Sequence, residues 1–270
     1  MKRIALGVQY DGTAWHGYQK QQDGQTVQDR LECALQKFAR VTLATTCAGR
    51  TDTGVHALEQ VIHFDTELER DIHAWVRGVN AFLPPSIAVR WAKQVDTCFD
   101  QQFHARFSAR SRTYHYVLYN HTTRSPLLAG RTGFVFRPLD VELMQQGANF
   151  LIGQHDFSAF RSSQCQAKSP VKLMHEISIE RHGELVVFTI RASAFLHHMV
   201  RNLVGSMIYV GTGKHPPAWL QDVLEGRDRH HAAPTFMPDG LYLAKIDYDP
   251  KWGLPQEVES PLSWFSRSSN

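Results

Sequence analysis

The order of strand and helix patterns along the chain is the feature that most restricts its fold. Up to about residue 95 the patterns follow the order β-α-β-β-α-β, at 3–12, 26–41, 44–48, 59–66, 69–83 and 86–95. After about residue 105 the same order recurs, at 111–120, 140–153, 173–183, 184–193, 197–211, 216–226 and 240–249. The repeat predicts an α+β fold of two tandem ferredoxin-like or RRM-like units, which together form a continuous, mostly antiparallel sheet. Helices are expected on one side of this sheet and an active-site cleft on the other.

A length of 270 residues also fits two domains, which we place at 1–104 and 105–270. Within the first, Thr26 is the expected N-cap of a helix whose apolar stripe faces the core. In the strand at 59–66, Val61, His63 and Asp65 alternate with apolar residues, so His63 and Asp65 are expected on a solvated face.

Composition excludes several classes of protein. Hydrophobic residues make up 43% of the chain and charged residues 20%, which is typical of a globular protein. No window approaches a membrane helix, and the N-terminus turns polar too soon for a signal peptide, so we expect a cytoplasmic protein without a membrane partner. The four cysteines form no CxxC pair, which argues against a zinc ribbon and a disulfide framework.

Basic residues are grouped more than the modest net charge of +3 suggests. In "HARFSARSRTYHYVLYN", Arg106, Arg110 and Arg112 share one parity and would point to one face of a strand. Such a face suits phosphates, although an ordinary solvated sheet surface explains it equally well.

The segment "AGRTDTGVHA", at 48–57, places Asp52 between Gly49 and Gly54, which permit a tight loop. An Asx-type turn with Arg50 paired to Asp52 on the surface is one interpretation. The other is a reactive carboxylate, acting as general base or nucleophile. The chain has no GxxxxGK[ST], HExxH or GxSxG motif.

A cation for such a carboxylate occurs in "FLHHMVRNLVG". Arg201 follows His197 by four residues, so both would share one face of a helix. Arg201 could keep Asp52 ionised, but a helix-surface arginine beside a capping or core pair, His197 and His198, is the alternative.

Seven segments in sequence resemble the TruA family of tRNA pseudouridine synthases. They are "YDGTAWHGYQKQ", "TVQDRLECAL", "AGRTDTGVHA", "VNAFLP", "FHARFSARSRTYHYVLYN", "FLHHMVRNLVG" and "DGLYLAKIDY", and the resemblance extends from Ile4 to about Tyr248. It implies an isomerase that converts uridine to pseudouridine in the anticodon stem-loop of tRNA, at tRNA positions 38, 39 and 40. It also implies a homodimer of two-lobed subunits that binds tRNA in a basic cleft and needs no metal or organic cofactor.

The same resemblance assigns roles to individual residues. Asp52 matches the catalytic aspartate and Arg50 the arginine that helps to extrude the target base. Tyr114 matches the tyrosine that stacks on this base, Arg201 the arginine paired with the aspartate, and Leu241 an apolar pocket residue. The first domain would thus carry the catalytic loop, and the second the tyrosine and the arginine helix. Further candidates for contact with the substrate are Lys20, Arg106, Arg110, Arg112, Arg161, Lys168 and His197.

The sequence leaves the route of Asp52 open: attack on C1′ of the ribose, attack on C6 of the base, or proton abstraction to give a glycal. Two other functions also compete with this one. A non-catalytic RNA-binding protein would explain the tandem units but gives no reason for the carboxylate. A hydrolase could use Asp52 with His56, His63 and Asp65, around a metal.

Overall fold

The computed structural model describes residues 1–95 and 101–255, which form two compact units. Unit 1 comprises Met1–Arg110 together with the segment that begins at Leu243, and unit 2 comprises Ser111–Tyr242. The last strand falls within the predicted domain of residues 105–270, yet from Leu243 onwards it packs in unit 1. The division into domains of 1–104 and 105–270 stays a prediction.

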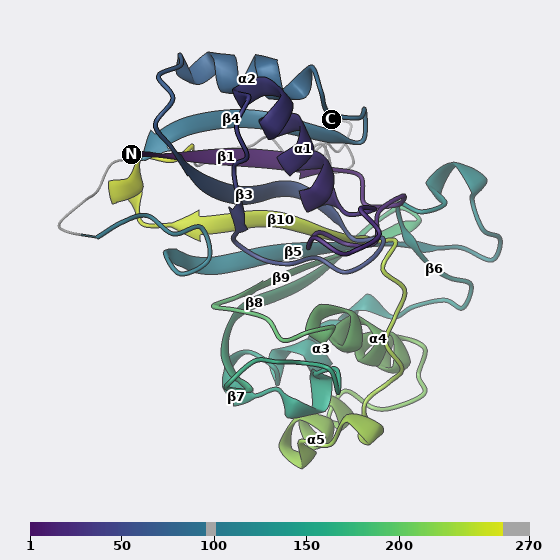
Figure 1. Ribbon diagram of the computed structural model, residues 1–270. Coiled ribbons are helices and arrows are strands. Elements are labelled where there is room, and N and C mark those ends of the chain that lie inside the picture. The colour runs from purple at the N-terminus through teal and green to yellow at the C-terminus, as the bar shows by residue number, and fades with distance from the viewer. Residues whose placement is uncertain (96–100, 256–270) are drawn as a thin grey trace, which may run out of the picture. The chain divides into compact units, whose positions relative to one another are not determined.

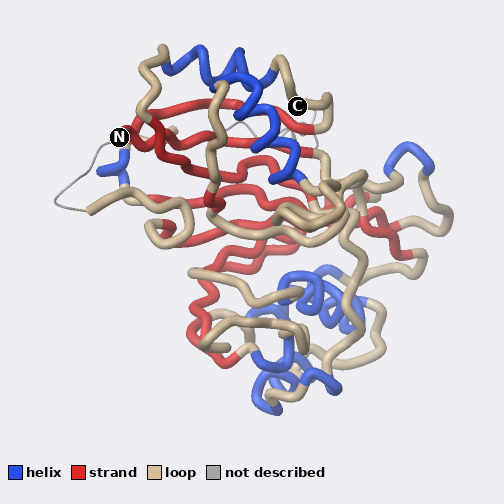
Figure 2. The backbone as a smooth tube through the Cα atoms, in the orientation of Figure 1, coloured by secondary structure: helices blue, strands red, loops and turns tan. Residues whose placement is uncertain are grey.

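Unit 1 is a mostly antiparallel sheet with two helices. Its strands run in the order β4-β1-β3-β2, which is the ferredoxin-like order, and β10 also pairs with β3. Strand β1 is antiparallel to both β3 and β4. The elements are β1 Lys2–Tyr10, α1 Val27–Ala39, β2 Thr46–Cys47, β3 His56–Thr66, α2 Ile72–Asn80, β4 Ile87–Val95 and β10 Leu241–Tyr248. All but the short β2 are labelled in Figure 1, and Figure 2 distinguishes helices from strands by colour.

The core of unit 1 lies between the helices and one face of the sheet. Thr26 caps α1 as expected, because its hydroxyl accepts a hydrogen bond from the Asp29 backbone N–H. Trp75 of α2 contacts Phe38 of α1 and Phe64 of β3, with ring centroids 5.3 and 5.1 Å apart respectively. These contacts place both helices on the face that carries the even-numbered residues of β3.

The opposite face of β3 is more enclosed than the sequence predicts. Asp65 is exposed, but His63 is only 5% exposed, so the prediction of a solvated His63 is wrong. The cause is a distant segment, because the backbone N–H of Ala105 donates to Nδ1 of His63 at 3.2 Å. On the same face Gly7 lies under the Trp91 indole, since a Cβ at position 7 would meet Nε1 at 2.1 Å.

Unit 2 contains a sheet and three helices. Its strand order is β5-β9-β8-β7, antiparallel throughout, and β6 pairs with β5 in parallel. Helix α3 packs on β8, where the Gln145 amide bonds the backbone of Ile177 and Ile179. The elements are β5 Ala109–Asn120, β6 Gly133–Val135, α3 Val141–Asn149, β7 Gly153–Asp156, β8 Val171–His182, β9 Leu185–Ala192, α4 Met199–Gly211 and α5 Trp219–Gly226 (Figure 1).

These elements confirm a mixed α+β fold built on antiparallel strands. The predicted turn between β8 and β9 is present, and Gly183 there has a φ of 60°. The helix predicted from residue 197 instead begins at Met199, because His198 has a left-handed φ of 62°. His197 therefore precedes α4, and the expectation that it shares a helix face with Arg201 is wrong.

Among residues 1–95 and 101–255, no helix has both the length and the apolar character that crossing a membrane requires.

Candidate active site

The loop that carries Asp52 connects β2 to β3 in unit 1 and is fixed at its base. The backbone N–H of Ala48 donates to the Val61 carbonyl at 2.8 Å. The fully buried Gln60 side chain bonds both backbone groups of Gly49, and its Nε2 donates to the Gly49 carbonyl at 2.5 Å. The first end of the loop is therefore tied to β3, and its second end continues directly into β3 at His56.

The tip of the loop is a hydrogen-bonded turn that leaves Asp52 half-buried. Thr51 is buried, and its hydroxyl lies 2.8 Å from the Tyr10 hydroxyl. The Val55 N–H donates to the Asp52 carbonyl at 3.1 Å, and Gly54 has a φ of 79°. The conformational freedom of glycine is thus used at Gly54, whereas Gly49 is not among the positive-φ glycines, contrary to expectation.

A second segment, residues 10–18, supports the loop from the side. The Tyr18 N–H donates to the Thr51 carbonyl at 3.0 Å. A Cβ at Gly17, whose φ is +86°, would lie 2.8 Å from this carbonyl, and a Cβ at Gly12 would lie 2.0 Å from the Val55 carbonyl. Both glycines therefore serve close packing against the loop, a role that sequence reasoning missed although "DGTAWHG" contains the signal.

The side chains that a metal-dependent hydrolase would use have other partners in unit 1. His56 is 2% exposed, and its Nδ1 accepts a hydrogen bond from the Gly12 N–H at 3.0 Å. Nδ1 of His63 accepts from Ala105, and Arg3 contacts both carboxylate oxygens of Asp65 at 2.7 and 2.6 Å. These contacts give the three residues structural roles.

Two cations lie near the base of the loop. Burial raises the pKa of the Cys47 thiol to about 11, while the charges of Arg50 and Arg106 act in the opposite direction. Arg50 and Arg106 are both exposed. Arg106 precedes β5, so the prediction that it lies on a strand with Arg110 and Arg112 is wrong. Unit 1 therefore presents positive charge beside the loop that carries Asp52.

In unit 2 the candidate residues lie on or beside β5 and α4. Tyr114 of β5 is 9% exposed, and its ring meets Phe195 edge-on at 5.0 Å. Arg201, in the first turn of α4, donates from Nε to the Phe236 carbonyl at 2.8 Å. Since this contact uses the Nε–H, a carboxylate or a phosphate would be bound through the Nη groups.

The segment that leads to Leu241 joins these elements. Leu241 is 5% exposed and begins β10, and its N–H donates to the Pro238 carbonyl at 2.8 Å. Tyr116 of β5 donates its hydroxyl to the Met237 carbonyl at 3.0 Å and contacts the ring of Phe236. Residues 236–241 thus link β5 to α4, which fixes the apolar Leu241 in the same unit as Tyr114 and Arg201.

A buried polar network holds this segment against α4. The amide of Asn202, fully buried, accepts from Thr235 Oγ1 at 2.7 Å and from Arg229 Nη2 at 3.1 Å. Gly205, one turn further along α4, allows the approach, because a Cβ there would lie 2.7 Å from the Pro234 carbonyl. Nothing in the sequence analysis pointed to this network, which fixes the carbonyl that bonds Arg201.

The remaining predicted contact residues are divided between the units. Lys20 is paired with Glu32 at 3.2 Å and Arg110 with Asp249 at 2.6 Å. Two arginines donate to backbone carbonyls. Arg112 donates to the carbonyl of Ser193 at 3.0 Å, and Arg161 donates to that of Cys165 at 2.9 Å. Lys168 is exposed, and the backbone N–H of His197 donates to Cys165 Sγ at 3.4 Å. Asp52, Arg50, Lys20, Arg106 and Arg110 belong to unit 1, and the other candidates to unit 2.

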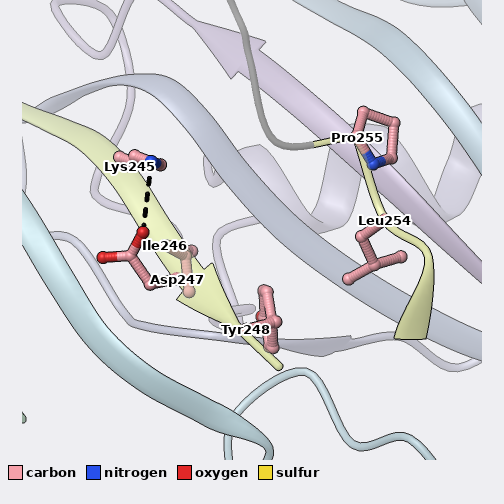
Figure 3. Close-up of a pocket in the computed structure, with 6 residues that line it drawn as sticks. All are labelled: Lys245, Ile246, Asp247, Tyr248, Leu254 and Pro255. Atoms are coloured by element: carbon pink, nitrogen blue, oxygen red, sulfur yellow. Dashed lines mark ion pairs between the residues drawn. The ribbon is translucent and has the colours of Figure 1, made fainter. Parts of the chain in front are cut away.

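A small pocket elsewhere in unit 1 contains none of these candidates. Figure 3 shows it beside the end of β10, where Lys245 and Asp247 form an ion pair of 3.2 Å. Its lining residues are Lys245, Ile246, Asp247, Tyr248, Leu254 and Pro255.

Comparisons with known proteins agree with one another. A family model described as tRNA pseudouridine synthase matches residues 7–108 and 148–249. The tRNA pseudouridine synthase A of Herminiimonas arsenicoxydans is 67% identical over 263 residues, which cover 97% of this chain and 96% of that protein. The protein of the same name from Janthinobacterium sp. (strain Marseille) is 69% identical over 264 residues, 97% of each chain. That from Burkholderia lata is 58% identical over 264 residues, covering 98% of this chain and 96% of the relative.

Proposed function

This chain belongs to the tRNA pseudouridine synthase family, and we infer that it is an isomerase that converts uridine to pseudouridine in tRNA. In this reaction the bond between C1′ of the ribose and N1 of uracil breaks. A bond from C1′ to C5 replaces it, N1 gains a proton and C5 loses one. No atom is added overall, so the enzyme must release the base, turn it and rejoin it within a closed site.

We propose Asp52 as the catalytic carboxylate. Support comes from the loop, because hydrogen bonds to β3 fix its first end and hydrogen bonds at Thr51 and Val55 fix its tip, while Asp52 itself stays half-buried, accessible to a ligand. A carboxylate held in this way is preorganised for attack or proton abstraction. Attack on C1′, attack on C6 and formation of a glycal all need the ionised form. Arg201, on the basis of the resemblance, would favour that ionised form.

The other candidate residues would handle the base and the backbone of the RNA. A uridine inside a stem must leave its stack before it can react. We propose that the exposed Arg50 helps to extrude the base, that Tyr114 stacks on it and that Leu241 closes the pocket. Contacts to phosphates would come from the exposed or partly exposed cations Lys20, Arg106, Arg110, Arg112, Arg161 and Lys168, with His197 as a further contact.

The finer features of the function rest on the resemblance alone. We propose that the target uridines lie in the anticodon stem-loop and that the enzyme acts as a homodimer in the cytoplasm. A native mass measurement in solution would test the dimer. Comparing intact tRNA with a tRNA that lacks the anticodon arm would test the target region.

The observation that carries the proposal is the family match over both units together with the rigidly held Asp52 loop. The direct test is release of tritium from tRNA whose uridines are labelled at C5, since C5 loses its hydrogen only when the new bond forms. Wild type should release tritium, Asp52→Asn should fall to background, and Thr53→Ala, a change at the exposed neighbour, should stay active.

Binding of the same tRNA by Asp52→Asn is the control for folding. It should be retained, because many phosphate contacts contribute to affinity. Tritium release by Asp52→Asn at the wild-type rate would contradict the role of Asp52. Binding without release by wild type would instead favour a non-catalytic RNA-binding protein.

A further inference from the structure

One aromatic side chain in unit 1 presents most of its surface to solvent. Phe107 lies in the turn that precedes β5 and is 76% exposed. Large aromatic residues are usually buried, because exposing a ring to water costs free energy. An exposed ring that is also fixed in position therefore indicates a binding role.

The turn fixes the backbone at Phe107. Nδ1 of His104 accepts hydrogen bonds from the backbone N–H groups of Arg106 and Phe107, each at 3.2 Å. Ser108 closes the turn, with its N–H donating to the His104 carbonyl at 2.9 Å. Since Nδ1 is an acceptor, the imidazole is neutral, in agreement with the lowering of its pKa by burial and by the charge of Arg3.

The imidazole of His104 supports the phenyl ring from behind. The two rings stack with centroids 4.2 Å apart and planes 28° apart. His104 in turn rests against the buried ring of His63 at 4.9 Å, and the Ala105 carbonyl accepts a hydrogen bond from the Tyr248 hydroxyl at 2.6 Å. Phe107 is thus the outermost of three rings in contact, of which His63 lies in the core of unit 1, so binding of a ligand here would cost little ordering entropy.

Positive charge adjoins this ring. The guanidinium carbon of Arg106 lies 5.8 Å from the centroid of Phe107. Ala105 of the turn bonds His63 of β3, and His63 lies opposite Thr46 in β2, the strand that leads into the Asp52 loop, so the turn and the base of this loop are neighbours within unit 1. A fixed aromatic face beside an arginine is the combination that binds single-stranded nucleotides, through stacking on the base and contact with the phosphate.

We propose that Phe107, backed by His104, is a stacking platform for a tRNA base that flanks the target uridine, and that Arg106 binds the phosphate beside that base. This rests on the proposed function. It adds a second RNA contact, distinct from the pocket that receives the reacting base. A base displaced from its neighbours when the target uridine leaves the stem would gain a new stacking partner here.

The test measures the dissociation constant of tRNA for full-length protein, in an Asp52→Asn background so that no turnover occurs. Phe107→Leu keeps an apolar side chain but removes the aromatic face, and it should raise the dissociation constant by about 5- to 150-fold, the range for loss of one stacked base. Phe107→Tyr keeps the aromatic face and should bind tRNA as tightly as the parent. Phe82→Leu, at another exposed phenylalanine of unit 1, is the matched control and should bind like the parent.

The salt dependence separates the two parts of the platform. Phe107→Leu should leave the slope of log K against log salt unchanged, whereas Arg106→Gln should reduce it by about 0.7 to 0.9, the effect of one phosphate contact. Unchanged affinity in Phe107→Leu would overturn the proposal. Conversion of a dimer to monomers by Phe107→Leu would also overturn it and assign the ring to a second copy of the chain. Tritium release by wild type is measured separately, so failure of the proposed function is recognised independently.

Discussion

Replacing Glu59 by glutamine should stabilise the protein, but only at neutral and alkaline pH. Glu59 lies in β3 and is 5% exposed. Burial raises the pKa of its carboxyl to about 7, and the Trp91 indole and the charge of Lys245 only partly oppose this shift. Lys245 itself is paired with Asp247 (Figure 3), which weakens its effect on Glu59. The folded chain therefore holds a costly carboxylate above about pH 7.

The size and sign of the effect follow from proton linkage. A carboxyl whose pKa is about 7 in the folded chain, against 4.5 as the reference value, binds its proton more tightly than in the unfolded chain. The free energy of unfolding therefore falls as pH rises through this window and is constant above it. The difference of about 2.5 units between the two pKa values corresponds to a loss of at most about 3 kcal/mol in the free energy of unfolding. A neutral glutamine of similar shape avoids this cost.

The measurement is urea unfolding of wild type and Glu59→Gln at pH 5 and pH 8. The variant should gain up to about 3 kcal/mol at pH 8 and much less at pH 5. The difference between the variant and wild type is measured because His63 contributes its own pH dependence to both proteins: burial lowers its pKa to about 4. That shift makes the free energy of unfolding rise with pH between about 4 and the reference value of 6.5. In wild type it therefore opposes the fall in the free energy of unfolding that Glu59 causes. An equal gain at both pH values would refute the reasoning.

Three further changes have defined outcomes. His63→Asn keeps a hydrogen-bond acceptor but cannot be protonated, so the loss of stability from pH 6.5 to pH 4.5 should become smaller. If thermal unfolding shows the same loss of stability over this pH range as in wild type, His63 is not its cause. Gly205→Ala would normally favour a helix, but its Cβ would lie 2.7 Å from the Pro234 carbonyl, so urea unfolding should show a loss of about 1–3 kcal/mol rather than a gain. Thr235→Val removes a donor to the buried Asn202, which should cost about 1 kcal/mol in stability and lower kcat more than it raises KM in the tritium assay; an unchanged kcat would show that the network does not orient the arginine of α4.

Sequence patterns correctly predicted the features that depend only on a short stretch of the chain. The N-cap Thr26 and the apolar stripe of α1 are properties of a short stretch of chain, and both are present. The turn at Gly183 also follows from its own sequence, since glycine adopts positive φ easily. By contrast, β6 and β7 have only three and four residues, too few for a pattern to stand out.

The sequence-based predictions were wrong or incomplete where a distant segment or an unusual backbone conformation determines the local structure. His63 has the alternation of a solvated strand face, and only the covering segment that contains Ala105 buries it. The left-handed conformation of His198 delays the start of α4 to Met199, two residues after the predicted start. The network around Asn202 joins residues 27 and 33 positions apart, so no local pattern could reveal it.

The division of β10 between the two units has a consequence for synthesis of the chain. Strand β3 pairs with β10, yet β10 is made some 175 residues after β3, when most of unit 2 has already been synthesised. Until Leu243 and the residues after it arrive, the part of that edge of β3 that β2 does not cover presents unpaired backbone groups, which are a template for association with other chains. A chain that stops before Leu243 should therefore be prone to aggregation, and a chaperone would act most usefully at this late stage of translation.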